Sequence, residues 1–593
     1  MAEPAASTDR DLDSIRDART LARRAKIAQT RLAELTQDQI DRIVDAAAAA
    51  AADQAEPFAR MAVEETGYGN VADKVRKNLF AAETIHRFIR PMRTVGVIAR
   101  HDTERVVEIA EPFGVVAAVV PSTNPTSTAI YKILICLKAR CAVVLSPHPS
   151  AVRSIRRVTD VMTEAAVGVG APEDAVNCMT TVTLEGTQEL MRCREVALVL
   201  ATGGLGLVRA AYSAGKPAYG VGPGNAPAYV ERTADVPKAV ADIITGKTFD
   251  NGVLCSSENS VVTDDAVAGE VRREFERQGG YFLSADEASR LAAQLVTPER
   301  LPNPRLVGKT ALEIAASVGI DVPAETRVLI APLDGVGREH PLSIEKLCPV
   351  LSFYVVSDWR AACQRCMEIL RYGGMGHTMS IHSRDEQVIL EFGLRKPAFR
   401  IVVNTPTTLG SIGMTTGLAP SMTLGCGGYG GNITSDNITP QHLLNIKRLA
   451  YEVRSVSRTT ELAPTAPAVP SLPEAPEKPA SGGLDRGLLA RRIETFLATR
   501  GIASAPPAEH DGRPHGQPND TASIQPLQTP SVTPPPQAPA PVEHPVEFVC
   551  EDDVRQAVRA NQRIVVNDRT IITPAARDLG VQHRVFIEAE LPR

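Results

Sequence analysis

Cys255 combines a nucleophilic side chain with a loop-like setting. It follows the turn sequence Phe249-Asp-Asn-Gly-Val-Leu and precedes Ser-Ser-Glu-Asn, which predicts a position at the exit of a loop. An exposed thiol near backbone amides or the start of a helix can have a lowered pKa and can attack an electrophilic carbon. The local sequence alone favours a passive, half-buried thiol, with an activated nucleophile as the alternative.

A glycine-rich turn follows the apolar run over 196–200. Its residues, Ala201-Thr-Gly-Gly-Leu-Gly, lead into a segment of helical period over 207–214. A strand that ends in glycines and opens a helix can turn backbone amides and a helix N-terminus toward the pyrophosphate of a dinucleotide. The spacing is not G-x-G-x-x-G, so an ordinary strand-to-helix turn is the alternative.

The elements that would position these two candidates follow an α/β pattern up to about residue 455. Apolar runs rich in Val and Ile alternate with Ala-rich segments of helical period. Early helices are expected over 36–52 and 75–89. Buried, mostly parallel strands are expected over 106–109, 114–120, 142–145, 197–200 and 227–230.

Composition excludes several classes of function. The 593 residues carry a net charge of −5, which leaves no basic excess for nucleic-acid phosphates or anionic lipid. No apolar stretch is long enough to cross a bilayer, and residues 1–30 contain Arg and Asp throughout. The ten cysteines are scattered, and the C-x-x-C pair Cys363 and Cys366 has no second pair to complete a zinc site. We expect a cytoplasmic protein with no nucleic-acid, membrane or metal partner.

Proline marks a change in organisation after residue 455. Residues 456–545 contain 18 of the 44 prolines and few large apolar side chains, which predicts linkers over 456–480 and 503–545. Between them, 481–502 predicts a short amphipathic helix with an apolar stripe formed by Leu489, Ile493, Phe496 and Leu497. Such a helix needs a partner surface for stability. Residues 546–593 predict a small α+β module with a helix over 552–561 and two or three short strands.

Over residues 20–455 the chain resembles the coenzyme A-acylating branch of the aldehyde dehydrogenase superfamily, including the acetaldehyde dehydrogenase half of bifunctional aldehyde-alcohol dehydrogenases. The matching stretches, in chain order, are Glu111-Pro-Phe-Gly-Val-Val, Pro121-Ser-Thr-Asn-Pro-Thr-Ser-Thr, Leu145-Ser-Pro-His-Pro-Ser, Ala201-Thr-Gly-Gly, Gly215-Lys-Pro-Ala, Gly220-Val-Gly-Pro-Gly-Asn, Phe249-Asp-Asn-Gly-Val-Leu-Cys-Ser-Ser-Glu, Glu345-Lys-Leu-Cys-Pro-Val, Gly376-His-Thr, Arg400-Ile-Val-Val-Asn-Thr-Pro and Leu424-Gly-Cys-Gly-Gly-Tyr-Gly-Gly-Asn.

The resemblance implies an aldehyde dehydrogenase fold of class α/β. A doubly wound, Rossmann-like cofactor domain is expected over 1–228, and an α/β catalytic domain with Cys255 over 229–430. Residues 431–455 would complete the enzyme core, and a largely disordered, Pro-rich extension would carry the short helix and the terminal α+β module. The family forms dimers or tetramers, so a homo-oligomer is expected.

The resemblance also implies roles for individual residues. Cys255 matches the nucleophile that attacks the aldehyde. Asn124 matches the amide that holds the oxyanion together with the backbone N–H of Cys255, although a turn residue before Pro125 fits the same sequence. Glu345 matches the carboxylate that positions the nicotinamide ribose, with a surface charge as the alternative. Other matches surround the cofactor: Ser122, Thr123, Ser146, His148, Thr202, Gly203 and Gly204.

Within that set, Thr202, Gly203 and Gly204 would lie beneath the pyrophosphate, and Ser146 and His148 would lie beside the adenosine ribose. Hydrolytic members of the superfamily usually carry Lys at the position of His148. The choice between NAD and NADP is therefore open.

One residue of the hydrolytic pattern is missing. Where hydrolytic aldehyde dehydrogenases have a Glu that activates water, this chain has Tyr219-Gly-Val-Gly-Pro-Gly-Asn with no carboxylate. A thioester on Cys255 would then persist until coenzyme A takes the acyl group. His377 is a candidate base for that thiol, since imidazole titrates near neutral pH, and a core histidine bonded to backbone groups is the alternative.

The C-terminal extension suggests where the enzyme works. The helix over 481–502 resembles the encapsulation peptides that target enzymes to the lumen of bacterial microcompartments; a helix folding back on its own enzyme is the alternative. Residues 546–593 are similar to a segment found in microcompartment-associated proteins. The expected function is oxidation of a small aldehyde to acyl-coenzyme A inside such a compartment. The extension would hold the enzyme there through contacts with shell or lumen proteins. A catalytically retired scaffold and a hydrolytic dehydrogenase are the alternatives.

Overall fold

The computed structural model describes residues 5–454, 491, 546, 548–560, 562–566 and 570–588. The chain divides into two compact units, Met1–Glu461 and Leu462–Arg593. Within the described part, no helix has the length and apolar character needed to span a bilayer. Apart from Arg491, the predicted helix over 481–502 lies outside the described residues.

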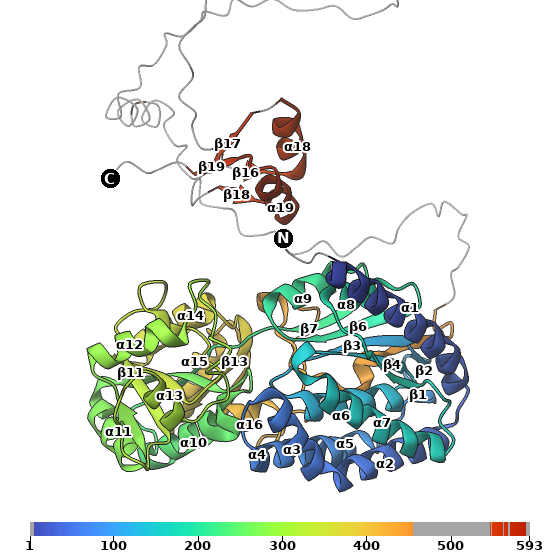
Figure 1. Cartoon of the computed structure of the whole chain (residues 1–593), viewed down its shortest axis with the longest axis horizontal. Helices are drawn as coiled ribbons and strands as arrows, with labels where there is room; N and C mark the ends of the chain where they lie inside the picture. The colour runs from blue at the N-terminus through green and yellow to red at the C-terminus, as the bar shows by residue number, and fades with distance from the viewer. Residues whose placement is uncertain are drawn as a thin grey trace, which may run out of the picture. The chain divides into compact units, whose positions relative to one another are not determined.

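A five-stranded parallel sheet forms the first half of the larger unit (Figure 1). Its strands are β3 (Val115–Val120), β4 (Ala142–Pro147), β5 (Val176–Cys178), β6 (Val196–Thr202) and β7 (Ala218–Val221). Their order in space is β5-β4-β3-β6-β7, so the chain winds outward from β3 in both directions. The switch between β3 and β6 creates a crevice at the carboxyl ends of these strands, where ligands bind in doubly wound folds.

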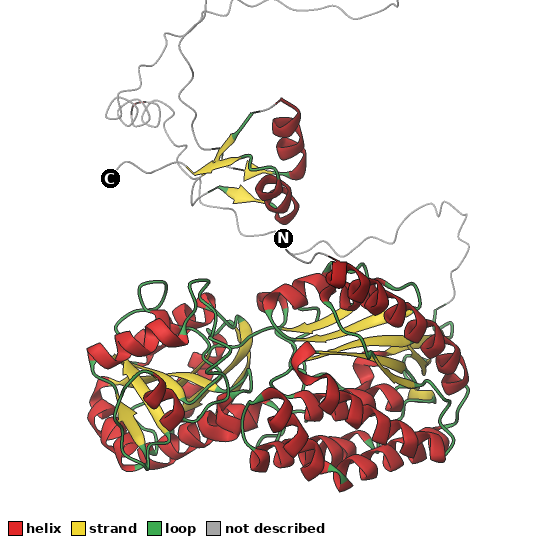
Figure 2. Cartoon of the chain, in the orientation of Figure 1, coloured by secondary structure: helices red, strands yellow, loops and turns green. Residues whose placement is uncertain are grey.

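Helices cover both faces of this sheet because the buried strand β3 presents apolar side chains on both sides. Val115, Ala117 and Val119 pack in one cluster with α1 (Ala5–Ala33) and α8 (Leu184–Arg192). The alternate residues Val116 and Ala118 pack in the other, with α2 (Gln37–Asp53), α6 (Pro125–Lys138) and α7 (Val152–Gly168). Successive strand side chains point to opposite faces. The predicted doubly wound architecture is therefore present, and Figure 2 shows its three layers.

The second half of the unit contains a seven-stranded parallel sheet with the order β10-β11-β12-β9-β8-β13-β14. Its strands are β8 (Ala226–Val230), β9 (Glu258–Asp264), β10 (Gly280–Phe282), β11 (Val328–Pro332), β12 (Val350–Val356), β13 (Gly376–His382) and β14 (Ala398–Val403). The flanking helices are α10 (Val236–Thr248), α11 (Asp265–Arg277), α12 (Ala285–Leu295), α13 (Ala311–Ser317), α14 (Trp359–Tyr372), α15 (Glu386–Leu394) and α16 (Thr407–Ser411). The boundary predicted at residue 228 falls within β8.

A third sheet corrects one prediction. The apolar run over 106–109 belongs to β2 (Val106–Pro112), which pairs antiparallel with β1 (Gly96–His101) and β15 (Leu444–Ala450). Strand β2 is only partly buried, as is common for antiparallel sheets that keep one face in water. A short β-branched run does not distinguish this setting from a buried parallel strand.

The N-terminal helices largely follow the sequence pattern. The helix predicted over 36–52 is α2. Thr36 caps it, because the Thr36 hydroxyl accepts a hydrogen bond from the backbone N–H of Gln39. The helix expected over 75–89 is present and begins earlier, at Val71: α4 (Val71–Leu79) runs directly into a π-helical turn (Phe80–Ile85) and α5 (His86–Ile89). Three further helices are α3 (Ala55–Thr66), α9 (Leu205–Tyr212) and a short η3 (Phe249–Gly252).

The smaller unit contains two helices and four short strands among its described residues, where one helix and two or three strands were predicted. The helices are α18 (Glu551–Ala560) and α19 (Pro574–Gln582). Strand β16 (Phe548–Val549) pairs with β18 (Ile571–Ile572), and β17 (Ile564–Val566) pairs with β19 (Phe586–Glu588), both in parallel. Val549, Val554, Ala576 and Val585 form part of a core of its own.

Candidate active site

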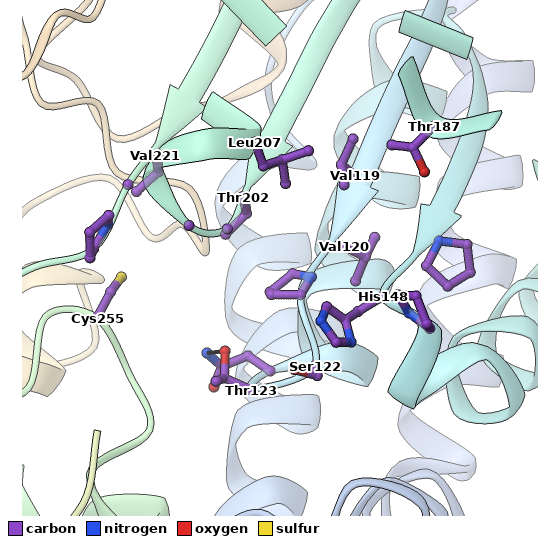
Figure 3. A pocket seen from close by; sticks show the side chains of 18 of the residues that line it. Val119, Val120, Ser122, Thr123, His148, Thr187, Thr202, Leu207, Val221 and Cys255 are labelled. Atoms are coloured by element: carbon purple, nitrogen blue, oxygen red, sulfur yellow. Dashed lines mark hydrogen bonds between the residues drawn. The ribbon is translucent and has the colours of Figure 1, made fainter. Parts of the chain in front are cut away.

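A cavity of about 490 Å³ opens at the carboxyl ends of β3, β4 and β6 (Figure 3). Its volume is typical of a site for a small molecule or cofactor. The segments that follow the strands of the five-stranded sheet form one side of it. The wall is completed by four residues of the catalytic half, Val253, Cys255, Glu345 and Leu347.

The end of β6 fits a dinucleotide pyrophosphate. Thr202, Gly203 and Gly204 line the cavity, and α9 begins directly after them at Leu205. Gly204 is the N-cap residue without a side-chain capping bond, and a β-carbon on it would contact nothing within 4 Å. The Thr202 hydroxyl is buried without a hydrogen-bond partner. The open helix start and the unpaired hydroxyl suit an anionic ligand.

The remaining predicted cofactor residues divide into two groups. Ser122, Thr123 and His148 line the cavity. Ser146 does not: it is fully buried in β4, and its hydroxyl lies 2.8 Å from the hydroxyl of Thr187, which does line the cavity. Ser146 can therefore influence a ligand only through Thr187, a residue that the sequence reasoning did not identify.

Cys255 lies in the turn between η3 and β9, at the end of the cavity near Thr202 and Val221 (Figure 3). The thiol is half-buried, and burial raises its pKa to about 12, with the Glu345 carboxylate acting in the same direction. The Arg400 guanidinium opposes this shift. The half-buried thiol favoured by the local sequence is present, and the exposed thiol with a lowered pKa, which was the alternative, is not.

Asn124 lines the same two cavities as Cys255. It stands at the N-cap position of α6 without making a capping bond. Its side-chain oxygen instead accepts a hydrogen bond from Lys77 Nζ at 2.5 Å. Asn124 is 9% exposed, so its amide group is buried but reaches the cavity surface.

The second cavity is small, about 30 Å³, and shares Cys255, Asn124, Thr202 and Val221 with the first. Its remaining lining is mostly apolar and contains no charged side chain: Thr128, Leu254, Ser256, Ile412, Met422 and Leu424. A volume of this size holds only about one or two non-hydrogen atoms beyond the nucleophile. Cys255 and Asn124 therefore lie between a large cavity and a small apolar one.

Glu345 is the one carboxylate among the described residues that line these two cavities. It accepts a hydrogen bond from the backbone N–H of Gly224 at 2.9 Å, and burial raises its pKa to about 8. The loop over 219–225 approaches Cys255 closely, since a β-carbon on Gly224 would stand 2.0 Å from the Cys255 carbonyl oxygen. This loop brings no carboxylate of its own to the nucleophile.

His377 does not line either cavity. It lies in β13 at 1% exposure, with Nδ1 2.9 Å from the hydroxyl of Thr378 and with Nε2 lacking a hydrogen-bond partner. Burial, and next the charge of Arg400, lower its pKa to about 3. The imidazole is therefore neutral at physiological pH. Its ring is near the Cys255 loop, because Cδ2 would lie 3.5 Å from a β-carbon on Gly224.

The sequence reasoning missed the charged residues beneath the site. Lys74, Lys77 and Asp250 form a buried cluster, and Arg400 received no role although it stands in a matched stretch. Buried lysines on a helix look like ordinary surface residues in a sequence, so no local signal identifies them. The C-x-x-C pair is buried in α14, and the described residues contain no group of three or more potential metal ligands.

Comparison with known proteins identifies relatives over the larger unit. Residues 8–279 match the model of the aldehyde dehydrogenase family. The bifunctional aldehyde-alcohol dehydrogenase of Escherichia coli K12 is 43% identical over 442 residues, which cover 74% of this chain and 50% of that protein. The chain thus spans about half the length of such bifunctional relatives.

Two solved structures are similar over nearly their whole length. An acetylating aldehyde dehydrogenase from Geobacillus thermoglucosidasius superposes with a TM-score of 0.74 at 48% identity, covering 75% of this chain and 98% of that one. A propionaldehyde dehydrogenase from the fucose utilisation microcompartment of Clostridium phytofermentans superposes with a TM-score of 0.66 at 30% identity, covering 74% and 98%.

Proposed function

The chain belongs to the aldehyde dehydrogenase family, and we propose that it oxidises a short-chain aldehyde to the corresponding acyl-coenzyme A with NAD(P)+ as electron acceptor. The observation that carries this proposal is the position of Cys255 and Asn124 between a cavity of cofactor size and a small apolar cavity. An aldehyde carbonyl at this junction would place its oxygen near Asn124 and its chain in the small cavity.

Cys255 is the proposed nucleophile. Its thiol proton passes to water in the large cavity, and the thiolate sulfur bonds to the aldehyde carbon. This gives a thiohemiacetal whose oxyanion is held by the Asn124 amide and the Cys255 backbone N–H. The nicotinamide ring, when bound, accepts the hydride of the former aldehyde carbon. As this C–H bond breaks, the oxyanion electron pair forms the C=O bond and leaves a thioester on Cys255. Glu345 is the proposed partner of the nicotinamide ribose.

Transfer of the acyl group to coenzyme A follows from the groups that face Cys255. The loop over 219–225 offers no carboxylate to activate water, and Glu345 is engaged with the Gly224 backbone. The coenzyme A thiol attacks the thioester carbon, and Cys255 leaves as thiolate. His377 is the proposed acceptor of the coenzyme A proton on geometric grounds, because its Nε2 has no partner and its ring lies beside the Cys255 loop. Burial lowers its pKa to about 3, so the expectation that it titrates near neutral pH was wrong.

The small cavity supports a short, uncharged aldehyde. Its volume of about 30 Å³ suits an acetyl or propionyl chain, and its lining has no cation to pair with a carboxylate or sulfonate. A charged substrate would have to bury its charge without a partner, which is strongly unfavourable. Acetaldehyde and propionaldehyde are therefore the proposed substrates.

The decisive experiment is an aldehyde panel assayed with NAD or NADP, each with and without coenzyme A. Steady turnover that requires coenzyme A and yields acyl-coenzyme A is expected, and Cys255→Ser should abolish it while nucleotide binding survives. Rapid release of free acid without coenzyme A would identify a hydrolytic enzyme. Bound nucleotide with no aldehyde oxidation would favour the scaffold alternative. The same panel decides between NAD and NADP.

We further propose that the enzyme is a homo-dimer or homo-tetramer. Edge strand β14 and the end of edge strand β15 expose apolar side chains, including Phe399 (43%), Val403 (39%) and Leu449 (47%). Exposed apolar edges of this kind are usually covered by another chain. Sedimentation of the chain ending at residue 455 tests this, and a strictly monomeric core would contradict it.

Location in a microcompartment lumen is proposed from the C-terminal extension and from the similarity to the Clostridium phytofermentans enzyme. Fusing residues 481–502 to a fluorescent reporter should bring it into shells in cells that make them. Replacing Ile493 and Phe496 with Asp should leave the reporter diffuse. If the enzyme without this segment is still packaged, another part of the chain is the targeting signal.

A further inference from the structure

We propose that Lys77 is a positioning residue that fixes the Asn124 side chain with its NH2 group toward the reacting carbonyl. This inference rests on the proposed role of Asn124 in holding the oxyanion. Lys77 lies in α4, far from the cofactor turn in sequence, and it does not line either cavity. Of the two side chains that its Nζ contacts, Asn124 and Asp250, only Asn124 lines the cavities.

The contact between Lys77 and Asn124 belongs to a cluster of three buried charges. Lys74 and Lys77 stand one turn apart on the same side of α4, each at 1% exposure, and Asp250 is fully buried. Lys77 Nζ contacts both Asp250 Oδ2 and Asn124 Oδ1, the latter at 2.5 Å. Lys74 Nζ contacts the same Asp250 oxygen at 2.9 Å and the backbone oxygen of Thr123 at 3.2 Å.

Asp250 connects this cluster to the nucleophile loop, five residues before Cys255. Its backbone has a φ of 49°, in the left-handed region. Two bonds to the start of α4 hold it there: its Oδ1 accepts from the backbone N–H of Asn70 at 2.8 Å, and its own N–H donates to Asp73 at 2.8 Å. The Cys255 loop and the Asn124 turn are therefore both attached to the same helix.

The chemistry of the partners sets the direction of the amide. An ammonium group has three donors and no acceptor, so Lys77 can pair only with Oδ1 of Asn124. The Nδ2 atom must then point away from Lys77. One of its two N–H groups donates to the Thr123 hydroxyl at 3.2 Å, and the other is left for an oxyanion. A positive charge on the amide oxygen also polarises the group and strengthens its N–H donors. Without Lys77, the amide could turn its oxygen toward the oxyanion.

The cluster contains two positive charges, Lys74 and Lys77, and one negative charge, Asp250. Two ammonium groups share one Asp250 oxygen, and burial with the nearby Lys74 lowers the pKa of Lys77 to about 8, against the pull of Asp250. Burying a second cation is unfavourable unless it has a further acceptor. For Lys77 that acceptor is the Asn124 side chain, whereas for Lys74 it is a backbone carbonyl. Lys74 is therefore a matched control.

The test is a double-mutant cycle on the burst of reduced cofactor formed from aldehyde in a single turnover. Lys77→Met should lower the burst rate by about 10- to 100-fold, less than complete loss of an oxyanion donor. In the Asn124→Ala background the same substitution should lower the rate by no more than about twofold, because its effect passes through the amide. Lys77→Arg should recover part of the wild-type rate. Lys74→Met should change the burst rate by the same factor in the wild-type and Asn124→Ala backgrounds, because Lys74 contacts the Thr123 backbone and not the amide.

Equal losses from Lys77→Met in the wild-type and Asn124→Ala backgrounds would overturn the inference, as would an unchanged rate in the single variant. If Lys77→Met does not fold, Lys77→Gln is used in the same cycle with the same criteria. The burst precedes transfer of the acyl group. Its outcome is therefore independent of whether coenzyme A or water finally takes the acyl group, and a failure of that part of the proposed function is seen separately in the product assay.

Discussion

Gly224→Ala should impair catalysis because there is no room for a methyl group between the loop over 219–225 and the nucleophile. A β-carbon on Gly224 would stand 2.0 Å from the carbonyl oxygen of Cys255 and 3.0 Å from its carbonyl carbon. Close C···O contacts in proteins are about 3.3 Å or longer. The two backbones must therefore separate by about 1 Å.

Either direction of that movement affects the site. If the Cys255 peptide moves, the sulfur and the oxyanion N–H shift relative to Asn124. If the loop moves, the bond from the Gly224 N–H to Glu345 is lost. A misplacement of about 1 Å at reacting groups costs about 100-fold in rate, or about 2.7 kcal/mol in the barrier. We expect kcat to fall by about that factor.

The assay is steady-state formation of reduced cofactor with saturating aldehyde and coenzyme A, together with thermal unfolding to exclude gross misfolding. Gly222→Ala is the matched control in the same loop, because its β-carbon would lie 3.4 Å from Leu205 Cδ2, an ordinary contact. That variant should keep kcat within about threefold of wild type. A Gly224→Ala enzyme with similarly small losses would refute the steric argument.

Four further predictions concern the thiol, the small cavity and the extension. Because burial raises the pKa of Cys255 to about 12, inactivation by iodoacetamide should accelerate about tenfold per pH unit from pH 7 to about 10; a plateau below pH 9 would contradict the shift. Glu345→Gln should accelerate the alkylation above pH 8, because the Glu345 charge raises the thiol pKa. Met422→Ala should enlarge the small cavity and raise kcat/KM for butyraldehyde relative to acetaldehyde by about tenfold, and unchanged chain-length preference would place the acyl chain elsewhere. A chain ending at residue 455 should keep the kinetic constants of the full chain, since both cavities lie in the first unit; a large loss of kcat would show that the extension contributes to the site.

Short-range patterns determined several features of this protein. Thr36 before an Ala-rich helical run gave the start of α2, and glycines after the apolar run over 196–200 gave the turn between β6 and α9. Both depend on local backbone chemistry, namely a capping hydroxyl and residues without β-carbons. Runs rich in Val and Ile likewise predicted the β3, β4 and β6 strands that carry Asn124, His148 and Thr202 at their carboxyl ends.

Other features needed the packed structure. The same kind of β-branched run became a buried parallel strand at 115–120 and a half-exposed antiparallel strand at 106–112, because the partner strands come from distant parts of the chain. The pKa of Cys255 also depended on packing. Its sequence context allowed an activated thiol, whereas burial raises the pKa.

The sequence by itself thus determined the fold class, the order of the elements and the residue types of the site, since these follow from side-chain periodicity and from motifs of a few residues. Only the tertiary structure decided where each residue lies relative to the large cavity: Thr202 lines this cavity, Ser146 lies behind Thr187, and His377 is buried in β13. It also decided that Lys77, 47 positions before Asn124, holds that amide. Burial, charge proximity and hydrogen-bond direction depend on distances between segments remote in the chain, and those distances are set only when the sheets and helices pack together.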